Sequence, residues 1–408
     1  MTTKEAITDK FKNLFRGDKV IWMVVVFLAL ISMLVVYTSS DSLAYREYND
    51  DNGRVLIKHL LMLGFGLMAL VIAANINYKR YSRLLLILFW VSAPLLLYTL
   101  LFGKNLNQAS RVIGIAGITF QSSDLAKLAL VGFLARVLTL KRDQLTDIKE
   151  LCFSVIIPIL LVVGLIFPAN FSTAAMLFAT CIVMMFLGKV KLKFIFGFVG
   201  AIAVVGVLTI FILLKLNGDN PQKNNRSQTW VGRIERFIGK GGDDDKKNDE
   251  KDFQLTQSKI AIAGGGVIGK MPGKSTQRTI LPHPYSDFIY AIILEEYGLV
   301  GGCFVLLLYL ILLYRAALVM IRAPQSFGAL LAMGLAFSLV MQAMVNMGVA
   351  VGLLPVTGQP MPFVSRGGTS LLFTGISLGI IISVTREIYK NDGNDTEIEV
   401  AESTEADS

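Results

Sequence analysis

The stretch VIWMVVVFLALISMLVVYT, residues 20–38, contains no charged side chain. About 20 such residues, wound into a helix, are enough to cross the hydrocarbon core of a bilayer. Runs of similar length recur along the chain of 408 residues, which is 54% hydrophobic and has a mean hydropathy of +0.60. The sequence therefore predicts an all-α, polytopic membrane protein, and it excludes a water-soluble domain.

We expect about ten transmembrane helices, which together form a membrane domain over residues 20–388. The predicted spans are residues 20–38, 57–75, 84–102, 122–140, 152–168, 172–187, 194–216, 287–313, 326–351 and 369–388. The tail that precedes them, residues 1–19, is basic and is followed by a full-length span with no small-residue cleavage site. We therefore expect the first span to be retained.

Lysine and arginine are concentrated in alternate short loops between these spans. They occur at residues 79–83, 141–149, 189–193 and 315–322, whereas the turn at residues 167–173 has none. The positive-inside rule then places the basic loops and both termini in the cytoplasm. The formal net charge of +9 follows from this topology and from attraction to anionic lipid, so it predicts no nucleic-acid partner.

One hydrophilic segment, residues 217–286, is much longer than the other loops, and the topology places it outside the cytoplasm. Within it, GGDDDKKNDEK (residues 241–251) is a charged low-complexity stretch that we expect to be a solvated tip. Residues 389–408 are acidic and poor in apolar side chains, which predicts a disordered cytoplasmic tail. The three cysteines lie in apolar runs without metal-ligand spacing, so we expect small core residues and no disulfide framework.

The segment LPHPYSDFIYAIILEEYGL, residues 281–299, places Asp287 where a polar loop meets an apolar span. An acid at the edge of a membrane helix is a candidate functional group, because ionisable groups are unfavourable there. The alternative is that Ser286 and Asp287 only cap the helix. Glu295 and Glu296 would lie about 12 to 14 Å further along the same helix, and we expect a structural pair buried against neighbouring spans.

Three further polar clusters interrupt the apolar pattern and should converge on the same face as Asp287. Gln121, Asp124 and Lys127 open the fourth span, where Lys127 either pairs with Asp124 or binds an anionic phosphate. The turn at residues 168–174 contains Asn170, which could simply cap the next helix. The loop at residues 346–370 is rich in proline and glycine, contains Arg366, and must line a cavity or be covered by protein.

Four motifs, in their order along the chain, resemble those of the SEDS family (shape, elongation, division and sporulation). They are FQSSDLAKLAL at residues 120–130, QLTQSKIAIAGGGVIGK at 254–270, LPHPYSDFIYAIILEEYGLVGG at 281–302, and GLLPVTGQPMPFVSRGGTS at 352–370. The resemblance covers roughly residues 20–388. It implies a ten-span peptidoglycan glycosyltransferase of the bacterial inner membrane that polymerises lipid II on the outer side. The last motif is more similar to the division-type, FtsW-like members than to the elongation-type, RodA-like members.

The resemblance also implies a set of site residues and partners. Asp287 would be catalytic, and the substrate-binding residues would be Lys127, Arg111, Gln121, Arg366, Ser365, Gln257 and Ser258. The implied partners are a class B penicillin-binding protein that crosslinks the new strands, and other proteins of the division machinery. A divalent cation, Mg²⁺ or Mn²⁺, is allowed on the pyrophosphate, although the chain shows no recognisable metal-ligand spacing.

The chain departs from the usual family motifs at several positions. Ser110, Arg111 and Val112 stand where the family often has Arg-Arg-Trp, and Asn170 stands where it has an aspartate. The usual His-Thr-Asp is Tyr285, Ser286 and Asp287, so the aspartate is kept and the histidine is lost. These changes put an imidazole role at residue 285 in doubt.

Polymerisation requires a base that activates the 4-hydroxyl of an acceptor sugar, and cationic or amide groups that stabilise a departing lipid pyrophosphate. Asp287 fits the base, and Lys127, Arg111 and Arg366 are candidate partners of the pyrophosphate. One base without a matching nucleophile predicts direct displacement with inversion. A lipid II flippase and a noncatalytic scaffold stay open as alternatives, although no internal repeat of the transporter kind is evident.

Overall fold

The computed structural model describes residues 17–39, 52–106, 109–115, 118–217, 246–281, 284–323 and 326–406. Most of the predicted N-terminal tail and, in the long hydrophilic loop, residues 218–245 and 282–283 lie outside these residues. In chain order, the main helices are α2 (Lys19–Ser39), α4 (Asn52–Asn75), α5 (Tyr78–Phe102), α6 (Ser122–Leu140), α7 (Ile148–Leu151), α8 (Ile157–Ile166), α9 (Phe171–Leu187), α10 (Leu192–Asn217), α12 (Lys246–Gly265), α13 (Ile289–Arg322), α14 (Phe327–Ala350) and α15 (Thr369–Ala406).

Each predicted span coincides with a helix or, for residues 152–168, with a helical run from α7 through a π-helical turn at Cys152–Ile156 to α8. Seven helices within the described residues are long and apolar enough to cross a bilayer. Of the other three predicted spans, α9 and the described part of α10 are shorter apolar helices, and α6 carries three charged side chains. The helical, multi-pass architecture is thus confirmed, while the number ten stays a prediction.

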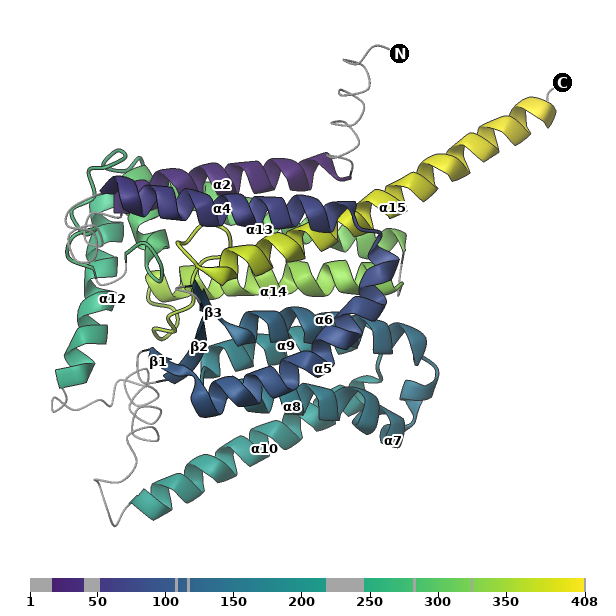
Figure 1. Ribbon diagram of the computed structural model, residues 1–408, viewed down its shortest axis with the longest axis horizontal. Coiled ribbons are helices and arrows are strands. Elements are labelled where there is room, and N and C mark those ends of the chain that lie inside the picture. Colours follow the sequence, from purple (N-terminus) through teal and green to yellow (C-terminus); the bar gives the residue numbers. More distant parts are fainter. Residues whose placement is uncertain are drawn as a thin grey trace.

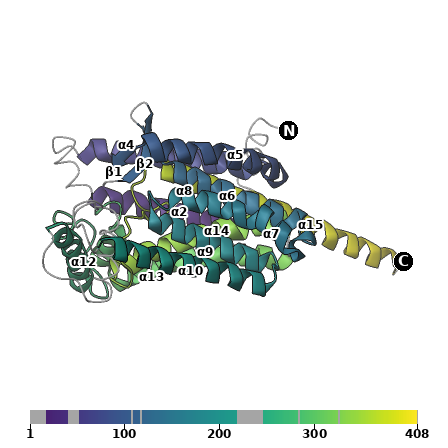
Figure 2. The same ribbon diagram turned by 90° about the horizontal axis from the view of Figure 1, so that it is seen from below.

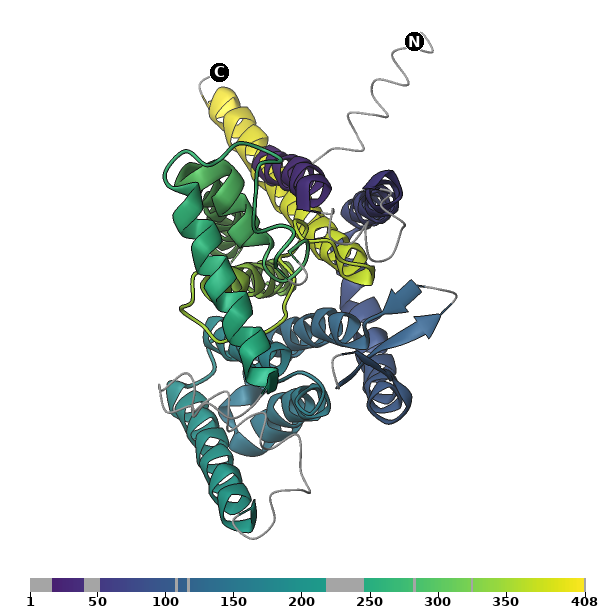
Figure 3. The same cartoon turned by 90° about the vertical axis from the view of Figure 1, so that its left-hand side faces the viewer.

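The long helices lie roughly side by side, and α12 crosses their ends (Figures 1 and 2). We call this the α12 end of the bundle. It contains the ends of α2 and α14 and the beginnings of α6, α13 and α15. Figure 3 views this end directly and shows α12 in front of the other helices. The opposite end contains Lys19 and Arg322, where Arg315 of α13 forms an ion pair with the buried carboxylate of Asp18.

The start of α12 and the end of α15 differ from the sequence predictions. Helix α12 begins at Lys246, inside the stretch that was expected to be a solvated tip. Helix α15 continues to Ala406, where composition predicts a disordered tail, and this extension projects away from the bundle (Figure 1). The described helix therefore extends through an acidic segment that has few apolar residues to bury.

A small antiparallel sheet lies between α5 and α6 and is not predicted by the sequence. Its strands are β1 (Lys104–Leu106), β2 (Ala109–Ile115) and β3 (Ile118–Phe120), with β2 in the centre. In the register, Lys104 is opposite Val112 and Ile113 is opposite Phe120. The sheet leads directly into α6 at the α12 end, so it positions the start of that helix beside the polar site.

Glycine allows α4 and α15 to approach each other closely. A methyl group at Gly375 of α15 would lie 2.1 Å from the backbone oxygen of Gly66 on α4, and one at Gly379 would lie 2.4 Å from the oxygen of Leu70. Small residues are typical of such contacts between membrane helices, because association there depends on close packing of backbones. The contact fixes the first turns of α15, which follow the loop that contains Arg366.

Candidate functional site at the α12 end

Asp287 lies in a turn at residues 284–288, which we call the Asp287 turn, immediately before α13. Its side chain is partly buried, and its Oδ1 accepts a hydrogen bond of 2.9 Å from Ser286 Oγ. The N-cap residue of α13 is Phe288, whose side chain makes no capping hydrogen bond. Asp287 therefore lies one residue before the N-cap position.

Helix α13 bends sharply at Gly298, whose φ of 67° and ψ of −168° are not helical. Glycine adopts this conformation without the steric penalty that a side chain would add. Across the bend, the side chains of Tyr290 and Leu294 lie against Gly302. In a straight helix Tyr290 would be about 18 Å from Gly302, so the first part of α13 folds back onto the second.

This bend reverses the predicted depths of the acids. Thr38, near the end of α2, donates a 2.9 Å hydrogen bond to Glu296. Ser32, further from that end, donates to the carbonyl of Val364. Ser365, the residue after Val364, donates to the carbonyl of Ser286 in the Asp287 turn. Six residues of α2 separate the two levels, or about 9 Å. The prediction that the glutamates lie deeper than Asp287 is therefore wrong: Asp287 lies nearer the middle of the bundle.

Glu295 and Glu296 are completely buried, and the loop that follows α12 satisfies them. Glu295 accepts hydrogen bonds from the side chains of Lys270, Ser275 and Thr276 and from the amides of Thr276 and Gln277. Glu296 accepts from the amide of Gly273 as well as from Thr38. These contacts support a structural role, although the partners come mainly from a loop and not from neighbouring spans.

The loop at residues 359–366 lies against the Asp287 turn, and it brings two predicted site residues there. Ser365 Oγ donates to the carbonyl of Ser286 at 2.7 Å, and the amide of Arg366 donates to the carbonyl of Tyr285 at 2.9 Å. The guanidinium of Arg366 lies 5.4 Å from the centre of the Tyr285 ring, within the range of a cation–π contact. Ser365 and Arg366 are thus adjacent to Asp287, as the sequence predicts.

Two amide side chains on α14 tie the site together and were missed by sequence reasoning. Asn346 Nδ2 donates to the carbonyls of Asp287 and Gln359, at 2.9 and 2.7 Å. Gln342 Nε2 donates to the carbonyl of Pro360 at 2.8 Å. Their spacing of one helical turn within an apolar span is a signal that could have been recognised, because polar residues at that depth need partners.

Lys127 forms an ion pair with Asp124 and a hydrogen bond with Gln342. Its Nζ lies 2.8 Å from Asp124 Oδ1 and donates to Gln342 Oε1 at 3.1 Å. Asp124, Lys127 and Gln342 line one narrow pocket between α6, α14 and α15, with Ser370 and Thr374. The Asp124 Oδ2 atom is buried there without a hydrogen-bond partner in the described part of the chain. The ion pair with Asp124 is therefore formed, and Lys127 also faces the pocket.

Gln121 and Arg111 both belong to the chain segment before α6. Gln121 Nε2 donates to Ser123 Oγ at 3.0 Å and to Asp124 Oδ1 at 3.4 Å. The backbone N–H of Gln121 donates to Thr369 Oγ1. Gln121 is thus linked to the start of α15 and to the Asp124 carboxylate. Arg111 belongs to β2, but its side chain is outside the described residues, so its predicted role stays a prediction.

Gln257 and Ser258 lie on α12, away from these contacts. Ser258 is fully buried, and its hydroxyl donates to the carbonyl of Ala350 at 2.7 Å, which fixes α12 to the end of α14. Gln257 is partly buried and makes no side-chain hydrogen bond among the described residues. The structure gives Ser258 a packing contact, and substrate binding by either residue stays a prediction.

The turn before α9 is structural at Asn170, as the capping interpretation predicts. Asn170 is the N-cap of α9 and accepts a hydrogen bond from the amide of Thr173 at 3.3 Å. The hydroxyl of Thr173 accepts from Gln359 Nε2 at 2.9 Å, which connects α9 to the loop beside Asp287. The loss of a carboxylate at residue 170 therefore leaves a cap in place.

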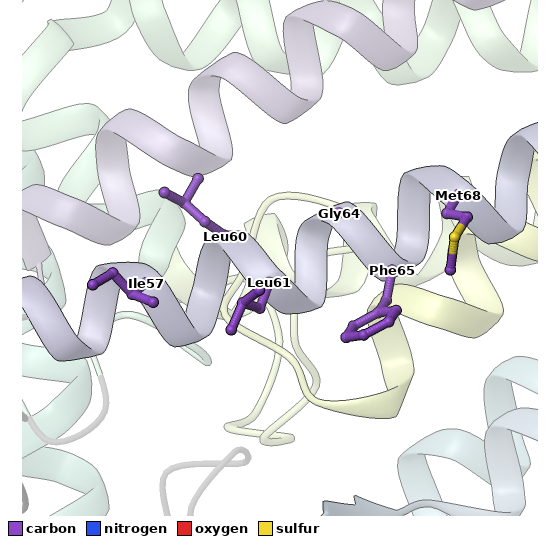
Figure 4. A pocket seen from close by; sticks show the side chains of 6 residues that line it. All are labelled: Ile57, Leu60, Leu61, Gly64, Phe65 and Met68. Atoms are coloured by element: carbon purple, nitrogen blue, oxygen red, sulfur yellow. The ribbon is translucent and has the colours of Figure 1, made fainter.

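Neither a metal centre nor the apolar pockets compete with this site. Within the described residues, no group of three or more histidine, cysteine, aspartate or glutamate side chains could hold a metal ion. A pocket on α4, shown in Figure 4, is lined by Ile57, Leu60, Leu61, Gly64, Phe65 and Met68 and offers no chemically reactive group. The predicted site residues whose side chains are described lie at the α12 end.

A bundle of helices, seven of which within the described residues are long and apolar enough to cross a bilayer, defines a multi-pass membrane protein. A family model for the cell cycle proteins FtsW, RodA and SpoVE matches residues 18–390. The chain belongs to this family, as its sequence motifs indicate.

Several relatives match almost the whole chain. Stage V sporulation protein E of Bacillus subtilis (strain 168) is 30% identical over 401 residues, which cover 95% of this chain and 99% of the relative. A protein of Geobacter sp. (strain M18) named probable peptidoglycan glycosyltransferase FtsW is 30% identical over 379 residues, with 90% and 96% covered. A protein of the same name from Haemophilus influenzae is 30% identical over 376 residues, with 91% and 90% covered.

Solved structures share the fold. One solved chain superimposes with a TM-score of 0.68 at 24% identity, covering 92% of this chain and 99% of that chain. It comes from a peptidoglycan synthase complex whose structure concerns the coordination of polymerization and crosslinking. The rod shape determining protein RodA of Thermus thermophilus gives a TM-score of 0.65 at 22% identity, covering 92% and 98%. At these identities the likeness concerns the fold alone.

Proposed function

We propose that this protein is a peptidoglycan glycosyltransferase that polymerises lipid II into glycan strands during cell division. The relatives named as glycosyltransferases of the FtsW type support the reaction and the division role. The observation that carries the assignment within the structure is the placement of Asp287. It is a partly buried acid that precedes the N-cap position of its helix and lies beside Ser365 and Arg366, in a turn held by hydrogen bonds.

In the proposed reaction, the Asp287 carboxylate accepts the proton of the 4-hydroxyl of the acceptor N-acetylglucosamine. The hydroxyl oxygen then bonds to C1 of the donor N-acetylmuramic acid, while the bond from C1 to the pyrophosphate oxygen breaks. The lipid pyrophosphate leaves with the bonding electrons, and the configuration at C1 inverts because no enzyme nucleophile intervenes.

Cationic side chains would stabilise the departing pyrophosphate. Arg366 offers a planar fork next to the Asp287 turn, and Lys127 offers a point charge in the neighbouring pocket. Arg111 on β2 and Gln121 at the start of α6 belong to the proposed substrate-binding set, together with Ser365, Gln257 and Ser258. Burial of these groups away from bulk water would strengthen their attraction for phosphate.

A divalent cation, Mg²⁺ or Mn²⁺, would have to take most of its ligands from the pyrophosphate and from water. The described residues contain no preformed set of three acidic or imidazole ligands. Because Mg²⁺ usually keeps several waters and binds through one or two carboxylates plus phosphates, a single carboxylate such as that of Asp287 would be enough to hold it. We therefore derive no step through a metal.

The sidedness follows from the distribution of lysine and arginine. We place the α12 end outside the cytoplasm and both termini inside, in the bacterial inner membrane, so that lipid II would be used after it has reached the outer leaflet. The proposed partner is a class B penicillin-binding protein that crosslinks the product, together with other proteins of the division machinery. Because the sequence contains no evident Ser-x-x-Lys and Lys-Thr-Gly pair, crosslinking is assigned to that partner.

The test is polymerisation of lipid II by the purified protein and its partner in detergent, where transport between compartments has no meaning. We expect glycan strands to form, and we expect penicillin to leave polymerisation unchanged while it blocks crosslinking. A complex of wild-type partner with the Asp287→Asn protein is the matched control and should make no polymer. A protein that forms no glycan in detergent, yet moves lipid II between the leaflets of a vesicle, would be a flippase and would overturn the proposal.

A further inference from the structure

Two buried hydroxyl groups hold the backbone of residues 362–364, close to the Asp287 turn. Tyr309, on the second part of α13, donates its phenolic hydrogen to the carbonyl of Pro362. Ser32, on α2, donates to the carbonyl of Val364 at 2.8 Å and also lies 3.0 Å from His59 Nε2 on α4. Three helices thus fix two carbonyl groups that are two residues apart.

The residue between those carbonyls has an unfavourable backbone conformation. Phe363 has a φ of +63°, in the left-handed region that bulky side chains rarely adopt, and its side chain is buried. Such a conformation persists only where the surrounding structure determines it more strongly than local preference does. The hydrogen bonds from Tyr309 and Ser32, one on each side of Phe363, provide that constraint.

The strained residue is connected to Asp287 by a short series of backbone contacts. Ser365 accepts a 2.7 Å hydrogen bond from the amide of Met361 and donates to the carbonyl of Ser286. The amide of Arg366 donates to the carbonyl of Tyr285. A change of backbone conformation at Phe363 would therefore displace the groups that hold the Asp287 turn on this side.

We propose that Tyr309 and Ser32 are positioning residues for the Asp287 site. Their hydroxyls fix the strained backbone at Phe363 and, through Ser365 and Arg366, the orientation of the Asp287 turn. The catalytic consequence rests on the proposed function, whereas the effect on the backbone does not depend on it. A misplacement of about 1 Å at a reacting group can reduce a rate about 100-fold, so loss of one hydroxyl should be visible in kcat.

The hydroxyl of a buried tyrosine usually has a hydrogen-bond partner, so a general packing role is the alternative. The chain contains matched controls for it. Tyr81 is also buried and donates to the carbonyl of Ala73 at 2.8 Å, where α4 meets α5 at the other end of the bundle. Ser92 is buried on α5 and donates to the carbonyl of Phe89 at 2.8 Å, within its own helix.

The experiment compares Tyr309→Phe with Tyr81→Phe, and Ser32→Ala with Ser92→Ala, each in the full-length protein with its partner. Hydrogen exchange is followed in detergent over residues 284–288 and 361–366, and kcat and KM for lipid II are measured on the same preparations. We expect exchange in both segments to accelerate about tenfold in Tyr309→Phe and Ser32→Ala. We expect kcat to fall about tenfold or more with KM changed less than about threefold. The two controls should change neither quantity.

The outcomes separate this proposal from the proposed function. Unchanged exchange in Tyr309→Phe and Ser32→Ala, or an equal effect in the control variants, would overturn the positioning role. Faster exchange with normal kcat would also overturn it, provided that Asp287→Asn is inactive. If instead Asp287→Asn polymerises lipid II normally while exchange still accelerates, the assigned base is wrong and the two hydroxyls still position the turn.

Discussion

Asp287 and Glu295 belong to one short segment, yet their surroundings differ greatly. Glu295 is fully buried, and its two oxygens accept five hydrogen bonds from residues 270–277. Asp287 is only partly buried, and the side-chain hydrogen bond described for it comes from the adjacent Ser286. A carboxylate fixed by five hydrogen bonds from one segment is suited to holding a loop, whereas a partly exposed one beside the loop that contains Arg366 can exchange a proton.

The strongest test of this contrast is Asp287→Asn. The amide has nearly the same shape but cannot accept the proton, so kcat for polymerisation should fall about 10²- to 10⁴-fold. Thermal stability in detergent should hardly change, because the backbone carbonyl that Asn346 contacts is retained. Near-normal polymer from this variant would remove Asp287 from the role of base.

Glu295→Gln should have the opposite profile. Because it leaves Lys270 without a charged partner and weakens several charge-assisted hydrogen bonds, we expect a loss of about 2 kcal/mol of stability. This value is below the range of about 3 to 5 kcal/mol for fully buried pairs, since Lys270 is partly exposed. A lowered unfolding temperature with normal kcat per folded molecule is expected. A loss of kcat at full stability would place Glu295 in the chemistry.

Lys127 lies between these two cases, since it is paired with Asp124 and also faces a pocket. If it binds pyrophosphate, Lys127→Met should raise KM or lower kcat about tenfold, with little change of stability. The double variant Asp124→Asn with Lys127→Met decides between the interpretations. Recovery of activity in the double variant would mean that Lys127 only neutralises Asp124.

The smallest expected effect is that of Thr38→Val, which removes one of the hydrogen bonds to Glu296. We expect a loss of about 1 kcal/mol of stability, because the other oxygen of Glu296 still accepts from the amide of Gly273. Chemical denaturation in mixed micelles would measure it. A decrease in kcat beyond the change in folded fraction would show that the glutamate cluster influences the reaction directly.

The spans were predictable because hydrophobic length is set by the bilayer, and the apolar runs mark it directly. The position of Asp287 before a helix and the approach of Ser365 and Arg366 were also predictable from ordered motifs. The bend at Gly298 was not predictable from hydropathy, because residues 287–313 form one continuous apolar run and hydropathy gives no information on backbone direction. The glycines at residues 298, 301 and 302 were the available signal.

The support around the site was harder to foresee, since it depends on contacts between residues distant in the chain. Tyr309, Gln342 and Asn346 each donate to a loop carbonyl, and their partners follow only from the packing of the helices. The β-strands were missed because β1 and β3 have only three residues each, and the seven residues of β2, ASRVIGI, do not alternate regularly between polar and apolar side chains.

The bend at Gly298 also restricts how this segment can vary in length. A methyl group at residue 298 would lie 2.3 Å from the carbonyl oxygen of Val267, so the bend is held against the loop that follows α12. From that fixed point back to Asp287 the chain is mostly helical, and each added or removed residue would rotate everything before it by about 100° and shift it by about 1.5 Å. The number of residues between Gly298 and Asp287 therefore sets both the distance and the direction of the Asp287 turn: substitutions along this interval can be tolerated, whereas a single insertion would turn the backbone of residues 285 and 286 away from Ser365 and Arg366.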